Sequence, residues 1–154
     1  MLHSASNQYN NKNNAHLHDP NSRYILIVDD EPDILSIIRR VVEEYGFNVC
    51  CFTKPSIALE HYKASPNIHR LVISDLQMPN INGFEFLRKV REINSDTKTF
   101  LTTSNFEMSN LGLLLLPNSN SSSSLNNLII DEFIQKPFSI EQLVALIRKH
   151  ITIS

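Results

Sequence analysis

The sequence has few cysteines, no long apolar segment and no secretion signal. Its two cysteines, Cys50 and Cys51, are adjacent. Neighbouring strand residues point to opposite faces, so no disulfide between them is expected. The longest leucine run, Leu113 to Leu116, is far shorter than the roughly 20 apolar residues of a membrane span. The N-terminus lacks the apolar core of a signal peptide. Free thiols are typical of a reducing compartment such as the cytosol. Together with the absence of a membrane span and a signal peptide, they predict a cytoplasmic protein with no membrane association.

An excess of either charge is also lacking. The chain has 14 Lys and Arg residues against 16 Asp and Glu residues, which gives a formal net charge of −2. A general nucleic-acid binder normally carries a basic surplus, so we expect no nucleic-acid binding. A length of 154 residues accommodates one domain but not comfortably two, and an apolar fraction of 42% allows a sizeable core.

Two segments have a composition that is unsuited to a packed core. Residues 1–22 are rich in Asn, His and Ser and show no apolar period, which predicts a disordered polar tail. Residues 111–127 begin with leucines and continue with Ser and Asn, and Pro117 should stop any helix that begins near Glu107. We expect the serine-rich part of this insertion to be a mobile loop. Its leucines form either the core face of a short helix, which we favour, or an exposed patch for a partner.

Strand and helix patterns alternate over a predicted domain of residues 23–151. Continuous apolar, β-rich runs predict strands at 24–28, 47–52, 70–74, 98–103 and within 128–135. Helical spacing predicts helices at 32–45 and 55–63, from 83 onward, and after a capping Ser139. This alternation predicts an α/β fold with a parallel sheet and helices on both of its faces. The chain ends three residues after Ile151, so we expect no output domain.

The first two predicted helices carry apolar residues at helical spacing. In the first helix the residues at helical spacing are Ile34, Leu35, Ile37, Ile38, Val41 and Val42. In the second helix the inward residues are expected to be Ile57, Ala58, Leu59 and Tyr62.

Polar residues follow the predicted strands at the edge where ligands bind in open parallel sheets. Asp29 and Asp30 follow the first strand, Asp75 the third, Thr103 ends the fourth and Lys136 follows the fifth. Three carboxylates at one edge repel each other, and Mg²⁺, which prefers oxygen ligands, would relieve that repulsion. An Asp can act as the nucleophile of phosphoryl transfer when positive charge surrounds the phosphoryl oxygens. The pattern therefore indicates a phosphoryl-accepting aspartate beside a magnesium site.

Each of these residues also has an ordinary interpretation when it is taken alone. Asp29 and Asp30 could cap a helix, Asp75 could stand in a turn, Thr103 suits any strand, and Lys136 could be a solvated loop residue. Their joint occurrence, each at the end of an apolar strand, is what favours a site.

Four segments stand out at the strand ends: residues 25–32, 71–83, 100–104 and 133–138, which include Asp-Asp-Glu-Pro, Ser-Asp-Leu-Gln-Met-Pro and Lys-Pro-Phe. Together they resemble the receiver domain of two-component response regulators, and in particular a single-domain, chemotaxis-regulator-like member. The resemblance implies a flavodoxin-like, doubly wound, five-stranded sheet of order 2-1-3-4-5. It also implies a single-domain response regulator of a two-component phosphorelay.

The resemblance assigns roles to the residues at the C-terminal ends of the strands, which together form the carboxyl edge of the sheet. Asp75 would be the phosphoacceptor, and Mg²⁺ would be held by Asp30, Asp75 and the backbone carbonyl of Gln77. Asp29 would act on the metal mostly through water. These assignments are what the resemblance implies, beyond what the spacing alone indicates.

Further roles follow from the same resemblance. Thr103 and Lys136 would contact the phosphoryl group, and the Lys136–Pro137 peptide bond would be cis. Thr103 and the strand-five aromatic residue, Phe133, would form a switch, although Phe133 could equally be a plain core residue.

The resemblance also implies how the protein takes part in signalling. Gln77 and Asn105 would tune the lifetime of the phosphoryl group. The donor would be a phosphohistidine on a histidine kinase or a histidine phosphotransfer protein, and the signal would pass to a protein partner. We expect a monomer or weak dimer that is not an enzyme beyond self-catalysed phosphoryl transfer and autodephosphorylation.

The sequence departs from the family pattern at two places, and three rival functions fit it to different degrees. Asn82 stands where the family usually has Asp, and residues 111–127 predict an irregular fourth helix region within the usual output and dimerisation surface. A haloacid-dehalogenase-type enzyme needs Asp-x-Asp after the first strand, which Asp29-Asp30-Glu31 does not supply. A flavin or dinucleotide binder needs glycines there, and the chain has only three. A pseudo-receiver that acts as a phosphorylation-independent interaction module remains the alternative.

Overall fold

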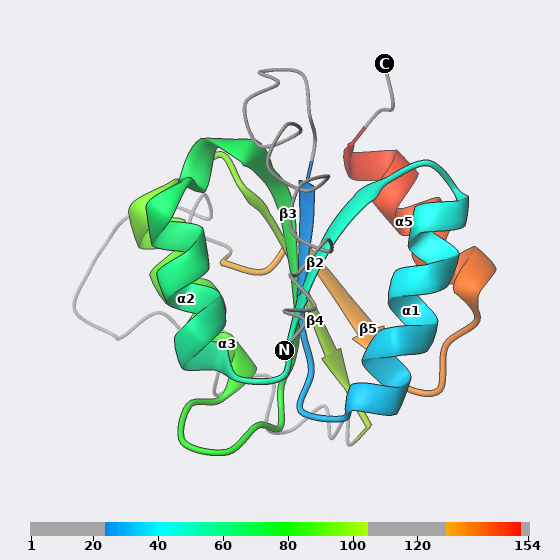
Figure 1. The fold of residues 1–154 in the computed structure, drawn as a ribbon, viewed down its shortest axis with the longest axis horizontal. Coiled ribbons are helices and arrows are strands. Elements are labelled where there is room, and N and C mark those ends of the chain that lie inside the picture. The colour runs from blue at the N-terminus through cyan, green and yellow to red at the C-terminus, as the bar shows by residue number, and fades with distance from the viewer. Residues whose placement is uncertain (1–23, 105–128, 152–154) are drawn as a thin grey trace, which may run out of the picture.

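The protein forms one five-stranded parallel sheet with helices on both faces (Figure 1). The computed structural model describes residues 24–104 and 129–151. Along the chain the elements are β1 (Tyr24–Val28), α1 (Pro32–Glu44), β2 (Asn48–Phe52), α2 (Pro55–Ala64), the 3₁₀ helix η2 (Pro66–Ile68), β3 (His69–Asp75), α3 (Gly83–Ile93), β4 (Lys98–Thr103), β5 (Glu132–Gln135) and α5 (Ile140–His150). The strand order is β2-β1-β3-β4-β5, so the predicted doubly wound flavodoxin-like sheet is confirmed. The predictions for the tail at 1–22 and the insertion at 111–127 lie outside the described residues.

Two hydrophobic cores cover the two faces of the sheet. In β1, Ile25 and Ile27 face the core under α1 and α5, while Leu26 and Val28 face the core under α2 and α3. Figure 1 shows these helix pairs on opposite sides of the strands. A strand that is buried on both faces is apolar at successive positions. This burial explains why the sequence of β1 does not alternate between apolar and polar residues. Within the described ranges no helix is both long and apolar enough to cross a membrane.

Helix starts are fixed by local sequence signals just beyond the strand ends. Pro32 occupies the first turn of α1, where its missing N–H costs nothing. The side chain of Asn82 accepts a hydrogen bond from the backbone N–H of Glu85 at the start of α3. Ser139 and Gln142 form a capping box at the start of α5, which confirms the predicted cap. These caps set where the loops at the carboxyl edge end.

The prediction that Ile57 faces inward is wrong, and Ile37, an apolar residue at helical spacing, also faces solvent. Ile37 is 60% exposed and Ile57 is 52% exposed. A helix that packs on a flat sheet buries a stripe of limited width, and consecutive residues are about 100° apart around its axis. Leu35, Ile38 and Val42 occupy the buried stripe of α1. The adjacent isoleucine therefore points to solvent.

Gly83 allows α3 to start directly against the end of β3. A Cβ atom at Gly83 would lie 2.0 Å from the backbone oxygen and 2.8 Å from the carbonyl carbon of Asp75. The Gly83 N–H donates to the carbonyl of Leu76, which holds the loop after β3 in place. This close approach couples the packing of α3 to the position of Asp75.

Replacing Gly83 by Ala should force α3 away from the end of β3. The added methyl group would clash with the backbone of Asp75, so we expect the free energy of unfolding to fall by about 1–3 kcal/mol. Urea denaturation would measure it. Ser36→Ala, at an exposed site of α1, is the control and should change stability by less than about 0.5 kcal/mol. Equal stability of Gly83→Ala and the wild type would contradict the described contact.

His69, the first residue of β3, is buried in an uncharged environment. It is 1% exposed, and its ring lies beside those of Tyr24, Tyr62 and His61. Burial and, to a smaller extent, the neighbouring His61 lower the pKa of His69 to about 4. The hydrogen bond to the Ser65 carbonyl acts to raise this pKa but does not offset the fall. The folded protein therefore keeps this imidazole neutral where the unfolded chain would protonate it.

Stability should consequently fall as the pH is lowered from about 6.5 to about 4. In that window the unfolded state binds a proton at His69 that the folded state does not, and the full effect is about 3 kcal/mol. Urea denaturation in buffer with EDTA would measure the fall for the wild type and for His69→Gln. The variant lacks this titration, so the stability gap between the two proteins should narrow as the pH falls. A gap that stays constant would refute a neutral, buried His69.

Candidate functional site

The carboxyl edge of the sheet brings together the acidic residues that the sequence singled out. Asp29 and Asp30 directly follow β1, and Asp75 ends β3. In the sheet register Val28 lies opposite Ser74, and Asp75 lies opposite Thr102. The two strands therefore end side by side. One carboxylate oxygen of each of Asp29, Asp30 and Asp75 lies within 4.8 Å of the others.

The acidic cluster is largely buried. Asp29 is 3% exposed and Asp75 is 6% exposed, whereas Asp30 is exposed to solvent. The backbone N–H of Glu31 donates to Asp29 Oδ1 at 2.9 Å, which orients that carboxylate. Carboxylates are rarely buried unless they are paired, so this cluster requires compensating positive charge.

Lys136, which directly follows β5, supplies part of that charge. Its Nζ lies 2.8 Å from Asp29 Oδ2 and 3.5 Å from Asp75 Oδ2. Burial acts to lower the pKa of Lys136, but the hydrogen bond to Asp29 and the charges of Asp29 and Asp75 outweigh it and raise the pKa. Lys136 is therefore a firmly protonated cation. It bridges two carboxylates that are far from it in the sequence.

The surroundings of Asp75 disfavour the negatively charged form of its carboxyl group. Burial raises its pKa, and the negative charges of Asp29 and Asp30 raise it further. Lys136 and a hydrogen bond from the backbone N–H of Gln77 act in the opposite direction without fully offsetting the rise. One ammonium group thus neutralises only part of the charge of three carboxylates.

A hard divalent cation fits the donor set at this edge. The groups that converge there are carboxylate oxygens, one of them solvent-exposed, and these are the ligands that Mg²⁺ accepts while it keeps several waters. A cation at this position would also relieve the repulsion that raises the pKa of Asp75. The chemistry of the residues therefore agrees with a magnesium site.

The remaining predicted residues lie close by in the fold. Thr103 ends β4 and is fully buried, and its carbonyl accepts a hydrogen bond of 2.8 Å from the Lys136 N–H. The pairs Leu101–Phe133 and Thr103–Gln135 place Thr103 and Phe133 on the same face of neighbouring strands, because side chains alternate along a strand. The Lys136–Pro137 bond is cis, as predicted.

Some of the predicted functions lie beyond what the geometry tests. Gln77 is exposed, and its backbone N–H reaches Asp75. Asn105 and the predicted fourth helix lie outside the described residues. The sequence reasoning missed the roles of the Glu31 N–H and of Gly83. A backbone amide carries no sequence signal, and a glycine before a helix has several possible reasons.

The sequence model of the response regulator receiver domain family matches residues 25–115. The transcriptional regulatory protein TrcR of Mycobacterium tuberculosis is 30% identical to the chain over 126 residues, which are 80% of this chain and 43% of that protein. The chain spans about half the length of the curated relatives that it matches.

Solved structures agree with this match. A response regulator receiver domain protein from Clostridium thermocellum superposes with a TM-score of 0.71 at 24% identity, over 84% of this chain and 94% of that one. The response regulator TrrA from Thermotoga maritima, in complex with Mg²⁺-BeF, has a TM-score of 0.65 at 27% identity, over 84% of this chain and 99% of that one. The first likeness is one of fold, and the second is to a protein that binds Mg²⁺.

Magnesium should stabilise the protein, and Asp30→Asn should weaken that effect. At a Mg²⁺ concentration of 100 times the Kd, the wild type should gain about 2.7 kcal/mol in the free energy of unfolding. Asp30→Asn removes one repelling charge, so without metal the variant should be at least as stable as the wild type. Its gain with Mg²⁺ should be smaller.

Urea denaturation with and without Mg²⁺ measures both effects. Asp33→Asn, an exposed acid in the first turn of α1, is the matched control and should gain as much from Mg²⁺ as the wild type. A full magnesium gain in Asp30→Asn would exclude this residue from the metal site.

Proposed function

The chain belongs to the response regulator receiver domain family, and from this premise we propose that it accepts a phosphoryl group on Asp75 in a Mg²⁺-dependent step. One observation carries the proposal. The buried carboxylate of Asp75, with its raised pKa, lies beside Asp29, Asp30 and the ammonium group of Lys136 at the carboxyl edge of the sheet. The site therefore combines a nucleophile, a fixed cation and a donor set for a hard metal ion.

The reaction forms one bond and breaks another. An oxygen of the Asp75 carboxylate attacks phosphorus, the P–N bond of a phosphohistidine breaks, and the histidine leaves with the electron pair and takes up a proton. Lys136, which lies 3.5 Å from Asp75 Oδ2, stays within reach of the phosphoryl oxygens of the product. Its ion pair with Asp29 holds the ammonium group at the site before the phosphoryl group arrives.

Bound Mg²⁺ supplies positive charge to the phosphoryl oxygens. Asp30, Asp75 and the backbone carbonyl of Gln77 would hold the ion, and Asp29 would act on it through water. Asp29 suits that outer role because both of its oxygens already accept hydrogen bonds from Glu31 N–H and Lys136.

Thr103 and Phe133 are proposed to report the phosphorylated state. The Thr103 hydroxyl would donate to a phosphoryl oxygen, and Phe133 would turn inward behind it. Their position on the same face of β4 and β5 supports this coupling. Gln77 and Asn105 are proposed to tune the lifetime of the phosphoryl group by orienting or blocking water.

We further propose that the phosphoryl donor is a histidine kinase or a histidine phosphotransfer protein, and that the output is binding to a protein target. A cavity of about 700 Å³ lies along β5 and α5, and its lining includes Phe133 and Lys136. Because Lys136 belongs both to this lining and to the acidic site, we propose the cavity as the surface on which the target binds. In this role the protein is a phosphoacceptor and not an enzyme acting on a separate substrate.

Incubation with acetyl phosphate and Mg²⁺ tests the proposed acceptor. The intact mass of the wild type should rise by one phosphoryl group, and EDTA or the substitution Asp75→Asn should abolish the rise. Asp96→Asn, an exposed loop carboxylate, is the control and should be modified like the wild type.

Two outcomes would overturn the proposal. A folded, Mg²⁺-binding wild type that is modified neither by acetyl phosphate nor by a panel of phosphorylated histidine kinases would indicate a phosphorylation-independent interaction module. Modification of Asp75→Asn to the same extent as the wild type would show that another residue is the acceptor.

A further inference from the structure

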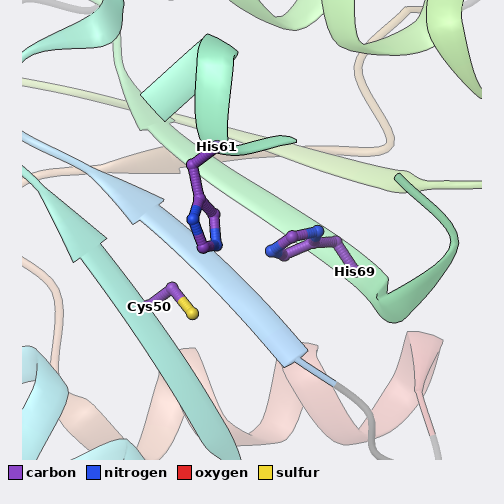
Figure 2. A group of neighbouring side chains, drawn as sticks. All are labelled: Cys50, His61 and His69. Atoms are coloured by element: carbon purple, nitrogen blue, oxygen red, sulfur yellow. The ribbon is translucent and has the colours of Figure 1, made fainter. Parts of the chain in front are cut away.

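A second cluster of potential metal ligands lies on the α2 side of the sheet. Cys50 of β2, His61 of α2 and His69 of β3 converge there (Figure 2). One ligand atom of each lies within 4.8 Å of the other two. Figure 2 shows the three side chains pointing toward a common space, with the ring of His61 extending from α2 above the Cys50 sulfur and beside the ring of His69. His69 begins β3 and Asp75 ends it, so this cluster and the acidic site lie toward opposite ends of the same strand.

The two histidines present buried nitrogen atoms without partners. Nε2 of His61 and Nε2 of His69 have no hydrogen-bond partner among the residues that the structure describes. Nδ1 of His69 lies 3.0 Å from the carbonyl oxygen of Ser65, which can only accept a hydrogen bond. In the neutral ring Nδ1 therefore carries the proton, and Nε2 carries a lone pair that is buried and unsatisfied. A buried polar atom of this kind costs free energy unless a partner is supplied.

The hydrogen bond from His69 to Ser65 has the form found around metal-bound histidines. A ligating histidine usually donates its other ring N–H to a carbonyl or carboxylate, which fixes the tautomer and the ring orientation. Here the backbone carbonyl of Ser65 plays that part. The ring of His69 is thus fixed with its free lone pair available within the cluster.

The surroundings of the cluster favour neutral imidazoles. Burial lowers the pKa of both His61 and His69, so both rings are free of a competing proton near neutral pH. Burial also raises the pKa of Cys50, so its thiol remains protonated until a metal ion displaces the proton. The aromatic rings of Tyr24, Phe52 and Tyr62 lie beside the two histidines and make their surroundings largely apolar.

We propose that Cys50, His61 and His69 form a binding site for a zinc ion. One sulfur and two imidazole nitrogens are a ligand set that favours Zn²⁺ over Mg²⁺. On binding, the Cys50 thiol releases its proton to solvent, a sulfur–zinc bond forms, and the Nε2 lone pair of His69 and one ring nitrogen of neutral His61 complete three protein ligands. Cys50 and His61 are only partly buried, so water can take the fourth position.

The geometry requires only a small closure. Zinc–sulfur and zinc–nitrogen bonds of about 2.3 Å and about 2.0 Å imply separations of roughly 3.3–3.6 Å between ligand atoms. The three atoms, all within 4.8 Å of one another, would therefore approach by at most about 1.5 Å. Such an approach lies within reach of side-chain rotation at Cys50 and His61, which are only partly buried, whereas His69 is buried.

Plain packing of aromatic side chains is the competing explanation. The ring centroids of His61 and His69 are 5.2 Å apart in an edge-to-face arrangement, which two phenyl rings could also adopt. Packing alone accounts neither for two unsatisfied nitrogens nor for a thiol among them. A metal ion satisfies all three groups at once. The inference does not depend on the proposed phosphorylation of Asp75.

Zinc and cobalt titration of the full chain tests the proposal. The protein is stripped with EDTA, dialysed, and titrated in excess Mg²⁺, which occupies the acidic site. In every protein used, the sequence's other histidines outside the cluster (His3, His16, His18 and His150) are replaced by Gln to remove adventitious ligands. Competition with a chromophoric chelator measures the zinc affinity. Co²⁺ binding reports a thiolate ligand through its sulfur-to-metal charge-transfer absorption.

One equivalent of zinc should bind, and Co²⁺ should show the charge-transfer band. Cys50→Ser should abolish the band, and Cys50→Ser and His61→Gln should each lower zinc affinity by about 100-fold or more, beyond the 10–100-fold typical of losing an outer-shell partner. Cys51→Ser is the matched control. Cys51 is the adjacent, equally half-buried cysteine, and it packs against the opposite core under α1 and α5, so its removal should change neither readout.

Two results would overturn the proposal. The first is the absence of stoichiometric zinc binding by the folded parent protein. The second is unchanged affinity and an unchanged cobalt spectrum in Cys50→Ser, which would show adventitious binding only. Circular dichroism and the stabilisation by Mg²⁺ show that each variant is folded, so lost zinc binding can be assigned to the lost ligand. His61→Gln, at a position less buried than His69, removes a ligand with less disturbance of the core.

Discussion

Two buried carboxylates that share one ammonium group are the constraint on which the carboxyl edge depends. Asp29 and Asp75 come from neighbouring strands, and the ammonium group of Lys136 reaches both from the loop after β5. Removing the cation would leave two buried negative charges side by side, which a folded protein tolerates poorly. The ion pairs therefore tie the two central strands to the far edge of the sheet. They also leave the site with a net negative charge, because one ammonium group faces three carboxylates, and this charge favours the binding of a further cation.

The same sheet brings together two clusters of potential metal ligands that differ in chemistry. The acidic site offers hard oxygen ligands at the end of β3, and the Cys50–His61–His69 cluster offers nitrogen and sulfur near its beginning. Hard and soft donor sets select different ions, so magnesium and zinc need not compete for one site. Rigid packing between the two faces of the sheet keeps both ligand sets in place, because β1 and β3 are buried on both sides.

Local sequence signals predicted the elements better than their orientation. Pro32, Asn82 and Ser139 stand at helix starts because each satisfies or removes a free N–H group there. Apolar content predicted too wide a buried stripe, since Ile37 and Ile57 face solvent. An apolar residue one position from the stripe has the same composition signal as one inside it. The rotation of the helix about its own axis, which its packing on the sheet sets, decides between them.

The sequence by itself determined the alternation of strands and helices, the polar residues at the strand ends and the family to which they point. Those features are local, because each depends on residues within one element. The tertiary structure alone decided that Lys136 lies closer to Asp29 than to Asp75, and that Cys50, His61 and His69 meet. These three ligands come from three elements at spacings that match no metal-binding motif. Their convergence arises from the parallel register of β2, β1 and β3 and from the packing of α2, which no local pattern encodes.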